Sequence, residues 1–272
     1  MKSSDAHLTP LFEAAFAQYH QHAFREKDPV SFVHRYLEPE DQEIIGFLSA
    51  VLAYGNVRSI LNNVDKAIAP LGEHPKNSII NENLSGKWEG FVHRFTQGID
   101  IEILVHWIRG AILQSGSIEA FFSEGREKET KLALDSFVSR LFTLPLPDHL
   151  AEHAVRRQRN LKFLVSRPSD GSACKRLNMY LRWMVRKQDG IDLGLWSHLD
   201  PAQLMLPVDT HLLKTLRLLG WTTSSAANWK VVEQATANLR RLCPKDPIRY
   251  DFALCHLSME GNALYLEKKN AS

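Results

Sequence analysis

The sequence is poor in cysteine and has no long apolar run. Its 272 residues contain three cysteines, Cys174, Cys243 and Cys255, which cannot all pair and show no CxxC or Cys/His spacing for zinc or an iron–sulfur cluster. No apolar run approaches the ~20 residues of a membrane-spanning helix, and the start MKSSDAHLTP lacks the apolar core of a signal peptide. We therefore expect a cytoplasmic protein with no membrane partner and no metal site.

The sequence also has little net charge, no repeat and almost no strand pattern. Lys and Arg number 33 against 31 Asp and Glu, a net charge of +2, so the total does not indicate an acidic partner. There is no fixed-period repeat and no sustained apolar/polar alternation, and only FVHRF at 91–95 is a candidate strand. Helical patterns recur instead, for example Ile44, Ile45, Leu48 and Leu52 on one face before Gly55. The predicted fold class is all-α.

The small net charge hides an uneven distribution. Residues 156–187 contain ten basic side chains and one acidic side chain, Asp170, so this segment carries +9 and the rest of the chain −7. Such a contrast is typical of a local phosphate-binding surface. A solvated helix face is the alternative explanation.

The segment SACKRLNMYLRWMVRK in this basic region predicts a helix that Asp170 or Ser172 caps. At about 100° per residue, one face is apolar, and the opposite face gathers Lys175, Asn178, Arg182 and Arg186. We expect an exposed cationic stripe that presents an amine and arginine forks suited to phosphate. An amphipathic surface helix with an ordinary lysine is the competing interpretation.

A second motif lies downstream, in LMLPVDTHLLKTLRLLGW. Here Asp209 is placed to cap an apolar helix that stops at Gly220, and such a cap stabilises by roughly 1 kcal/mol. A carboxylate fixed by helix N–H groups also suits the stabilisation of a developing cation, so cap and catalyst are compatible. We interpret His211 as an ordinary residue of the helix start.

These two motifs together resemble the helix-hairpin-helix DNA glycosylase superfamily, which includes endonuclease III and the 8-oxoguanine glycosylases. The family's hairpin has a glycine, a small residue, and a lysine that opens a helix with an asparagine three residues on. The matching segment here is GSACKRLN at 171–178, and the family's Val-Asp-Thr-His helix start matches Asp209. The 34 residues from Lys175 to Asp209 look more like the archaeal 8-oxoguanine glycosylase branch than endonuclease III. More closely, CKRLNMYLRWMVRK, GIDLGLW and DPIRYDFAL resemble a bacterial family of unknown function over nearly the whole chain.

The resemblance implies a bifunctional glycosylase and abasic-site lyase, with Lys175 as the Schiff-base lysine and Asp209 as the catalytic aspartate. A damaged base, for example 8-oxoguanine, would leave the stack and enter a pocket. The residues expected at DNA are Gly171, Ser172, Arg176, Asn178, Arg182, Arg186 and Asn56, the last in place of the glutamine with which the superfamily probes the duplex. The expected base pocket consists of Trp183, Trp196, Tyr250, Asp251 and Phe252.

The same resemblance bears on cofactors, partners and architecture. The iron–sulfur cysteines of endonuclease III are missing, and SRPSDGSAC replaces the usual Leu-Pro-Gly-Val-Gly hairpin core, so a monovalent cation at the hairpin is the one cofactor left open. The implied partner is double-stranded DNA with a damaged base or an abasic site, bound by a monomer at the nucleoid. The implied fold has two helical lobes around a cleft, residues 36–200 and residues 1–35 with 201–272, with Asp209 at the hinge.

Three alternatives remain at this point. A non-catalytic nucleic-acid-binding protein would keep the basic stripe without the reaction. A helical scaffold would dock an acidic protein on the same face. RNA would replace DNA as the partner, because a basic cleft does not by itself distinguish sugars.

Overall fold

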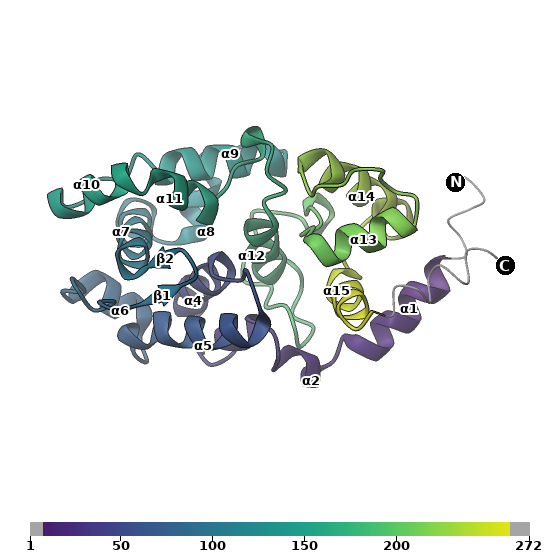
Figure 1. The fold of residues 1–272 in the computed structure, drawn as a ribbon, viewed down its shortest axis with the longest axis horizontal. Helices are drawn as coiled ribbons and strands as arrows, with labels where there is room; N and C mark the ends of the chain where they lie inside the picture. The colour runs from purple at the N-terminus through teal and green to yellow at the C-terminus, as the bar shows by residue number, and fades with distance from the viewer. Residues whose placement is uncertain (1–7, 262–272) are drawn as a thin grey trace. The chain divides into compact units, whose positions relative to one another are not determined.

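Helices predominate in the computed structural model, which describes residues 8–261 (Figure 1). Within that range the only sheet is an antiparallel hairpin of β1 (Val92–His93) and β2 (Thr96–Gln97), in which Val92 pairs with Gln97 and His93 with Thr96. The prediction of an all-α protein is confirmed, and FVHRF supplies the first strand of this hairpin. None of the described helices is long and apolar enough to cross a membrane.

The chain divides into a continuous unit, residues 25–167, and a discontinuous unit that joins residues 1–24 to residues 168–272. The expected lobes also joined the N-terminal segment to the C-terminal part, but they placed the second boundary at residue 200. The helix that carries Lys175 therefore belongs to the same unit as Asp209, and not to the unit formed by the preceding residues. The reason is that this helix is ion-paired to acidic residues between 189 and 251.

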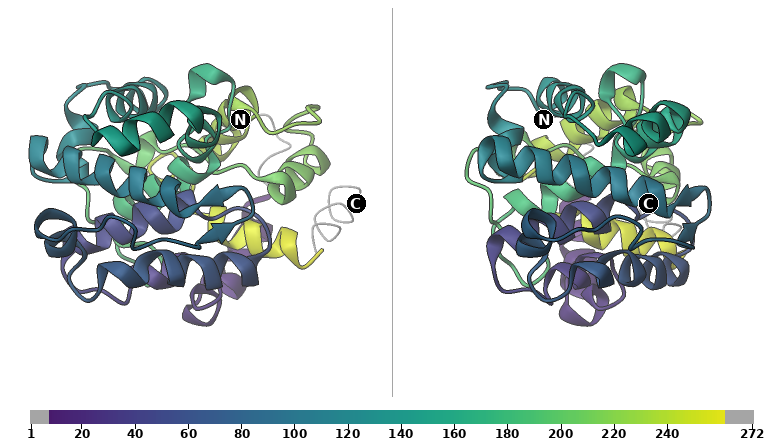
Figure 2. Two further views of the ribbon diagram at one scale, coloured as in Figure 1. Left: turned by 60° about the vertical axis from the view of Figure 1, so that its left-hand side comes forward. Right: turned by 90° about the vertical axis from the view of Figure 1, so that its left-hand side faces the viewer.

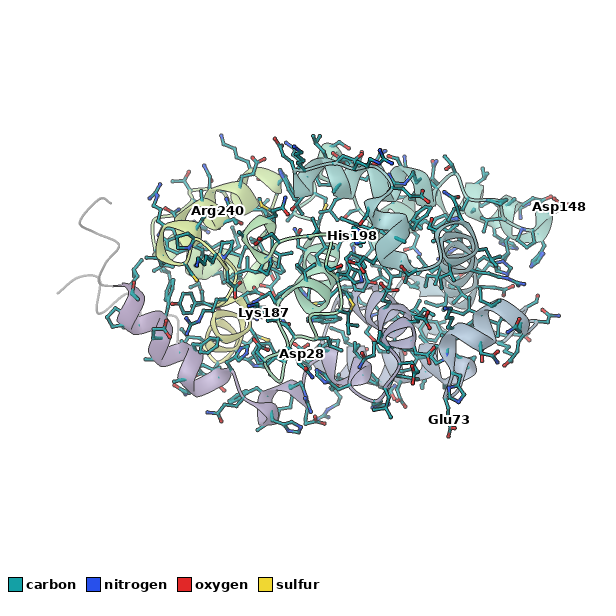
Figure 3. The ribbon with its side chains drawn as sticks, turned by 180° about the vertical axis from the view of Figure 1, so that it is seen from behind. Asp28, Glu73, Asp148, Lys187, His198 and Arg240 are labelled. Atoms are coloured by element: carbon teal, nitrogen blue, oxygen red, sulfur yellow. The ribbon has the colours of Figure 1, made fainter. Side chains whose placement is uncertain are left out.

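The continuous unit consists of short helices and the β-hairpin. Its elements are α3 (Val30–Val33), α4 (Pro39–Val51), α5 (Val57–Ile68), the 3-10 turn η1 (Ala69–Leu71), α6 (Pro75–Asn81), β1, β2, α7 (Gly98–Ser115), α8 (Ile118–Ser123), α9 (Thr130–Leu141), α10 (Asp148–Arg156) and α11 (Gln158–Leu164). Figure 2 shows the hairpin as two small arrows among these helices. Exposed acidic residues such as Glu73 and Asp148 project from this unit (Figure 3).

Helix α7 lies in the core of the continuous unit. Its N-terminus is a capping box, in which Gln97 accepts from the backbone of Asp100 and the Asp100 carboxylate accepts from the Gln97 N–H at 2.8 Å. Position 98 requires glycine because the backbone passes close to Trp88 there: a Cβ at Gly98 would lie 1.9 Å from the Trp88 carbonyl oxygen. Helix α4 buries the apolar face that the sequence predicted, including Ile44 and Leu48.

The discontinuous unit combines one N-terminal helix with the C-terminal part of the chain. Its elements are α1 (Leu8–Tyr19), the turn η2 (Pro168–Asp170), α12 (Lys175–Val185), the turn η3 (Pro201–Gln203), α13 (Thr210–Leu218), α14 (Trp229–Leu242) and α15 (Asp251–Met259). The short helix α2 (His22–Arg25) follows α1 at the boundary between the units. Helix α15 packs against both α1 and α13 (Figure 1).

Candidate functional site

A compact turn precedes the helix of Lys175. After η2, the Gly171 N–H donates to the Pro168 carbonyl at 2.9 Å, and Gly171 has a φ of +79°, which glycine adopts without a steric cost. Ser172 forms an antiparallel bridge with Asn228, and its hydroxyl accepts from the Cys174 N–H at 3.0 Å. Helix α12 begins only at Lys175, and its N-cap is the left-handed Cys174 without a side-chain cap bond. The expected cap by Asp170 or Ser172 is therefore wrong, because both residues belong to the turn.

Lys175 is the first residue of α12 and is half-buried. Its Nζ donates to the Sδ of Met179 at 3.3 Å, and within the described residues no carboxylate lies in ion-pair distance of this amine. A helix N-terminus disfavours a cation, and a thioether is a weak acceptor. The position of Lys175 therefore adds little to folding stability, and its amine is held by one weak contact.

Asn178 shapes the turn from inside the helix. Its side chain is buried, and Nδ2 donates to the Ala173 carbonyl at 3.1 Å, while the Asn178 N–H bonds to Cys174. The predicted contact between Asn178 and DNA is replaced by this structural role. Gly171 and Ser172 stay at the surface of the turn, so their contact with DNA remains a prediction.

Asp209 caps α13 as predicted. Its Oδ1 accepts from the Leu212 N–H at 2.7 Å, and its carbonyl accepts from Leu213 at 2.9 Å. The helix ends where the sequence indicated, with Gly220 at a φ of +68°. The second carboxylate oxygen is left without a hydrogen bond in the described part of the chain, so Asp209 combines a fixed position with an available acceptor.

The predicted cationic stripe on α12 is wrong, because Arg182 and Arg186 are buried, with exposures of 3% and 5%. Arg182 donates from Nε to Asp192 at 3.1 Å and from Nη1 to Asp251 at 2.5 Å. Because the side chain is buried and pairs with two carboxylates, it has no exposed edge for a phosphate.

Arg186 is enclosed by three carboxylates. It binds Asp246 through Nε at 3.0 Å, Asp189 through Nη1 at 3.1 Å, and Asp192 through the same Nη1. These carboxylates hold the pKa of Arg186 far above its usual range against the opposing effect of burial. Arg176 is also buried, whereas Lys187, labelled in Figure 3, is exposed.

Asp192 is the residue that the sequence analysis missed, and it is completely buried between the two arginines. The loop that carries it turns back on α12: Leu193 and Trp196 donate backbone bonds to the carbonyls of Trp183 and Met184, each at 2.8 Å. The signal was in the sequence, since Asp189 and Asp192 follow Arg186 directly. The basic segment ends at Lys187, just before these two carboxylates.

Asp251 connects this ion-pair cluster to Lys175. Burial raises the pKa of Asp251 above its ordinary value, and the attraction of Arg182 opposes that rise. Lys175 is among the charges that act on this carboxyl group in the same direction as Arg182. The positive charge of Lys175 therefore favours the ionised form of the Asp251 carboxyl group.

The residues expected to line a base pocket are packed in the core of the discontinuous unit. Trp196 lies edge-on to Tyr180 at 5.3 Å, and Tyr250 packs on Phe12 at 5.4 Å and binds Glu13 through its hydroxyl. All five are buried: Trp183, Trp196, Tyr250, Asp251 and Phe252. In this structure they are core residues.

Asn56 lies in the continuous unit as the N-cap of α5. Its Oδ1 accepts from the N–H groups of Arg58 at 3.0 Å and Ser59 at 3.5 Å. The residue is exposed at the surface, next to Gly55, which has a φ of +103°. A contact between Asn56 and DNA remains a prediction.

The comparison with protein families gives one match that covers most of the chain. The family described as "Protein of unknown function (DUF2400)" matches residues 28–260. The chain belongs to this family. The matched range contains every candidate residue named above, from Asn56 to Phe252. No curated protein and no solved structure gives a significant match.

Proposed function

We propose that this protein is a DNA base-excision glycosylase with abasic-site lyase activity and a helix-hairpin-helix fold. The observation that carries the proposal is the position of Lys175: it opens α12 directly after a glycine-containing turn, and its amine is bound to a thioether instead of a carboxylate. Asp209 supports the proposal, because it lies in the same unit as a fixed carboxylate with an unused oxygen.

The chemistry requires a neutral amine, a leaving base and a stabilised cation. The Nζ lone pair of Lys175 forms a bond to C1′ of the sugar while the bond from C1′ to the base breaks and the base takes up a proton. The Asp209 carboxylate stabilises the positive charge that develops on the sugar. The new amine then loses a proton, and its nitrogen forms a double bond to C1′ while the C1′–O4′ bond breaks and O4′ takes up a proton, which gives the Schiff base. In the following β-elimination, C2′ loses a proton and the C3′–O bond to the 3′ phosphate breaks.

The proposed partner is double-stranded DNA with a damaged base, for example 8-oxoguanine, or with an abasic site. The protein acts as a monomer in the cytoplasm, at the nucleoid when it is bound to DNA. The proposed reaction needs no cofactor, and the turn before α12 is the place where a monovalent cation would bind. Because Arg182 and Arg186 are enclosed by carboxylates, backbone N–H groups of the turn and exposed cations such as Lys187 take over the contacts with phosphate.

Borohydride trapping tests this proposal. Duplexes with an abasic site or 8-oxoguanine are incubated with the parent chain, Lys175→Ala and Asp209→Asn in the presence of borohydride, which reduces a Schiff base to a stable adduct. We expect an adduct with the parent, none with Lys175→Ala, and a slower reaction with Asp209→Asn. Lys245→Ala, which alters an exposed lysine of the same unit outside the turn and α12, serves as the control for loss of one cation. No adduct with the parent, or an adduct that survives in Lys175→Ala, overturns the proposal.

A further inference from the structure

The continuous unit contains a cavity that the sequence did not indicate. Its volume is about 520 Å³, within the range of small-molecule sites. The lining combines rings and cations: Phe95, Arg156, Arg157, Arg159, Asn160 and Phe163. Phe95 comes from the β-hairpin, and the other residues come from α10, α11 and the junction between them.

Two phenylalanine rings at this cavity are held in place but not covered. Phe95 is 46% exposed and Phe163 is 39% exposed, and their ring centroids lie 4.7 Å apart in an edge-on arrangement. Tyr54 stacks on Phe95 at 5.3 Å, and its hydroxyl donates to the His93 carbonyl at 2.9 Å. Exposed aromatic faces on a rigid support are what a planar base needs for stacking.

The arginines at the cavity have different roles. Arg157 is fixed by Asp100, with Nε–Oδ1 and Nη2–Oδ2 distances of 2.5 and 2.6 Å, and it donates to the Phe95 carbonyl at 2.8 Å. It therefore supports Phe95. Arg159 is exposed and has no carboxylate partner within the described residues, so its guanidinium is available for a phosphate.

Asn160 adds a polar side chain to the lining of the cavity. Both its Oδ1 and its Nδ2 are buried and have no hydrogen-bond partner within the described residues. An unsatisfied buried donor and acceptor cost free energy, so the Asn160 amide is an unpartnered polar group in the wall of the cavity.

We propose that this cavity is a nucleotide-binding site, in which a base stacks on Phe163 and lies edge-on to Phe95, and the phosphate binds Arg159. The inference goes beyond the proposed function, because the site lies in the other unit and does not involve Lys175 or Asp209. A phosphorylated nucleoside reaches the cavity either as a free mononucleotide or as one residue of a single strand.

Calorimetry tests the site by titration of the full chain with adenosine 5′-monophosphate, adenosine and inorganic phosphate. Fluorescence anisotropy with a labelled single-stranded deoxyoligonucleotide distinguishes a free mononucleotide from a nucleotide within a strand. Phe163→Leu removes the ring but keeps an apolar side chain, and we expect it to weaken both the monophosphate and adenosine about tenfold. Arg159→Gln should weaken the monophosphate about tenfold and leave adenosine unchanged. The control is Arg126→Gln, an exposed arginine of the same unit outside the cavity.

The results separate this site from the proposed function. The site is supported if Phe163→Leu and Arg159→Gln both weaken binding of the monophosphate. If the same variants also lower the anisotropy of the labelled strand, the ligand is a nucleotide within a strand. Absence of monophosphate binding, or binding that neither variant changes, overturns the inference. If Phe163→Leu fails to fold, the exposed Arg159 decides alone. A chain that binds the monophosphate but forms no borohydride adduct keeps this site and loses the glycosylase proposal, and the reverse result has the opposite meaning.

Discussion

At the scale of single residues, the role of Arg182 is decided by its partners. Removal of one member of a buried ion pair leaves the remaining charges uncompensated. In Arg182→Met, the carboxylates of Asp192 and Asp251 lose the cation between them. The variant should therefore lower the free energy of unfolding by about 3–5 kcal/mol. Urea denaturation measures this loss. The control Lys187→Met removes an exposed cation and should change stability by no more than about 0.5 kcal/mol.

The opposite pattern would restore a role in phosphate binding. If Arg182→Met unfolds at the same urea concentration as the parent but loses affinity for DNA, the guanidinium contacts phosphate and the buried network is not what holds the loop after α12.

Asp209 allows its two roles to be separated at the same scale. Asp209→Asn keeps an oxygen that can accept from the Leu212 N–H, whereas Asp209→Ala loses the cap and about 1 kcal/mol of stability. On the proposed function, both variants should lose most lyase activity, and only the alanine variant should lose stability. Thermal unfolding and cleavage of an abasic duplex measure the two effects, and full cleavage by Asp209→Asn would leave Asp209 as a cap only.

At the scale of elements, the loop after α12 depends on one glycine. Gly194 has a φ of +64°, and a Cβ there would lie 2.9 Å from the Gln188 nitrogen and 3.0 Å from the Arg186 carbonyl oxygen. Gly194→Ala therefore combines left-handed strain of about 1–2 kcal/mol with a backbone clash, and we expect a loss of stability beyond the strain alone.

A neighbouring glycine provides the matched control for this prediction. Gly190 has a φ of +90°, but a Cβ added there would meet no atom within 4 Å, so Gly190→Ala adds strain without a clash. Chemical denaturation of both variants should show the larger loss for Gly194→Ala. Equal losses would mean that the loop moves away from α12 to make room.

The sequence predicted the positions of helices better than it predicted which helix faces meet solvent. The apolar face of α4 and the two ends of α13 follow from local patterns, namely Ile44 and Leu48 in one and Asp209 and Gly220 in the other. The face of α12 that carries Arg182 was predicted wrongly because Asp251 lies 69 residues away in the chain. Periodicity identifies the polar side of a helix, but it does not show whether that side meets water or distant carboxylates.

At the scale of the whole molecule, histidines make stability depend on pH. Burial lowers the pKa of His106, against the attraction of Glu102, and burial likewise lowers the pKa of His93. The folded chain thus holds these rings neutral while the unfolded chain takes up protons near pH ~6.5. Their contribution to stability is present above that pH and is lost as the pH falls below it, at up to about 1.4 kcal/mol per pH unit for each ring.

Urea unfolding at about pH 7.5 and about pH 5.5 tests this dependence. His106→Gln should show a smaller loss of stability between the two values than the parent, and His153→Gln, which alters another histidine of the same unit, is the control. A parent whose stability is constant or rises on acidification would contradict the prediction.

The division into units shows a similar limit of local patterns. The N-terminal and C-terminal parts were expected to combine, but the boundary after Arg167 depends on the carboxylates that bind α12. The cavity around Phe95 and Phe163 was not predicted either, because its residues come from two segments about which the sequence gives no local signal of proximity.

The packing of α1 on α15 has a consequence for biosynthesis. Glu13 binds Arg249 and Tyr250, and Tyr19 donates to Glu260, so α1 waits for partners translated more than 200 residues later. Residues 25–167 are synthesised without interruption and can fold while translation continues. During that interval the apolar side of α1, including Phe12, has no cover from α15. Until α15 has been synthesised, this side of α1 is open to chaperones and proteases.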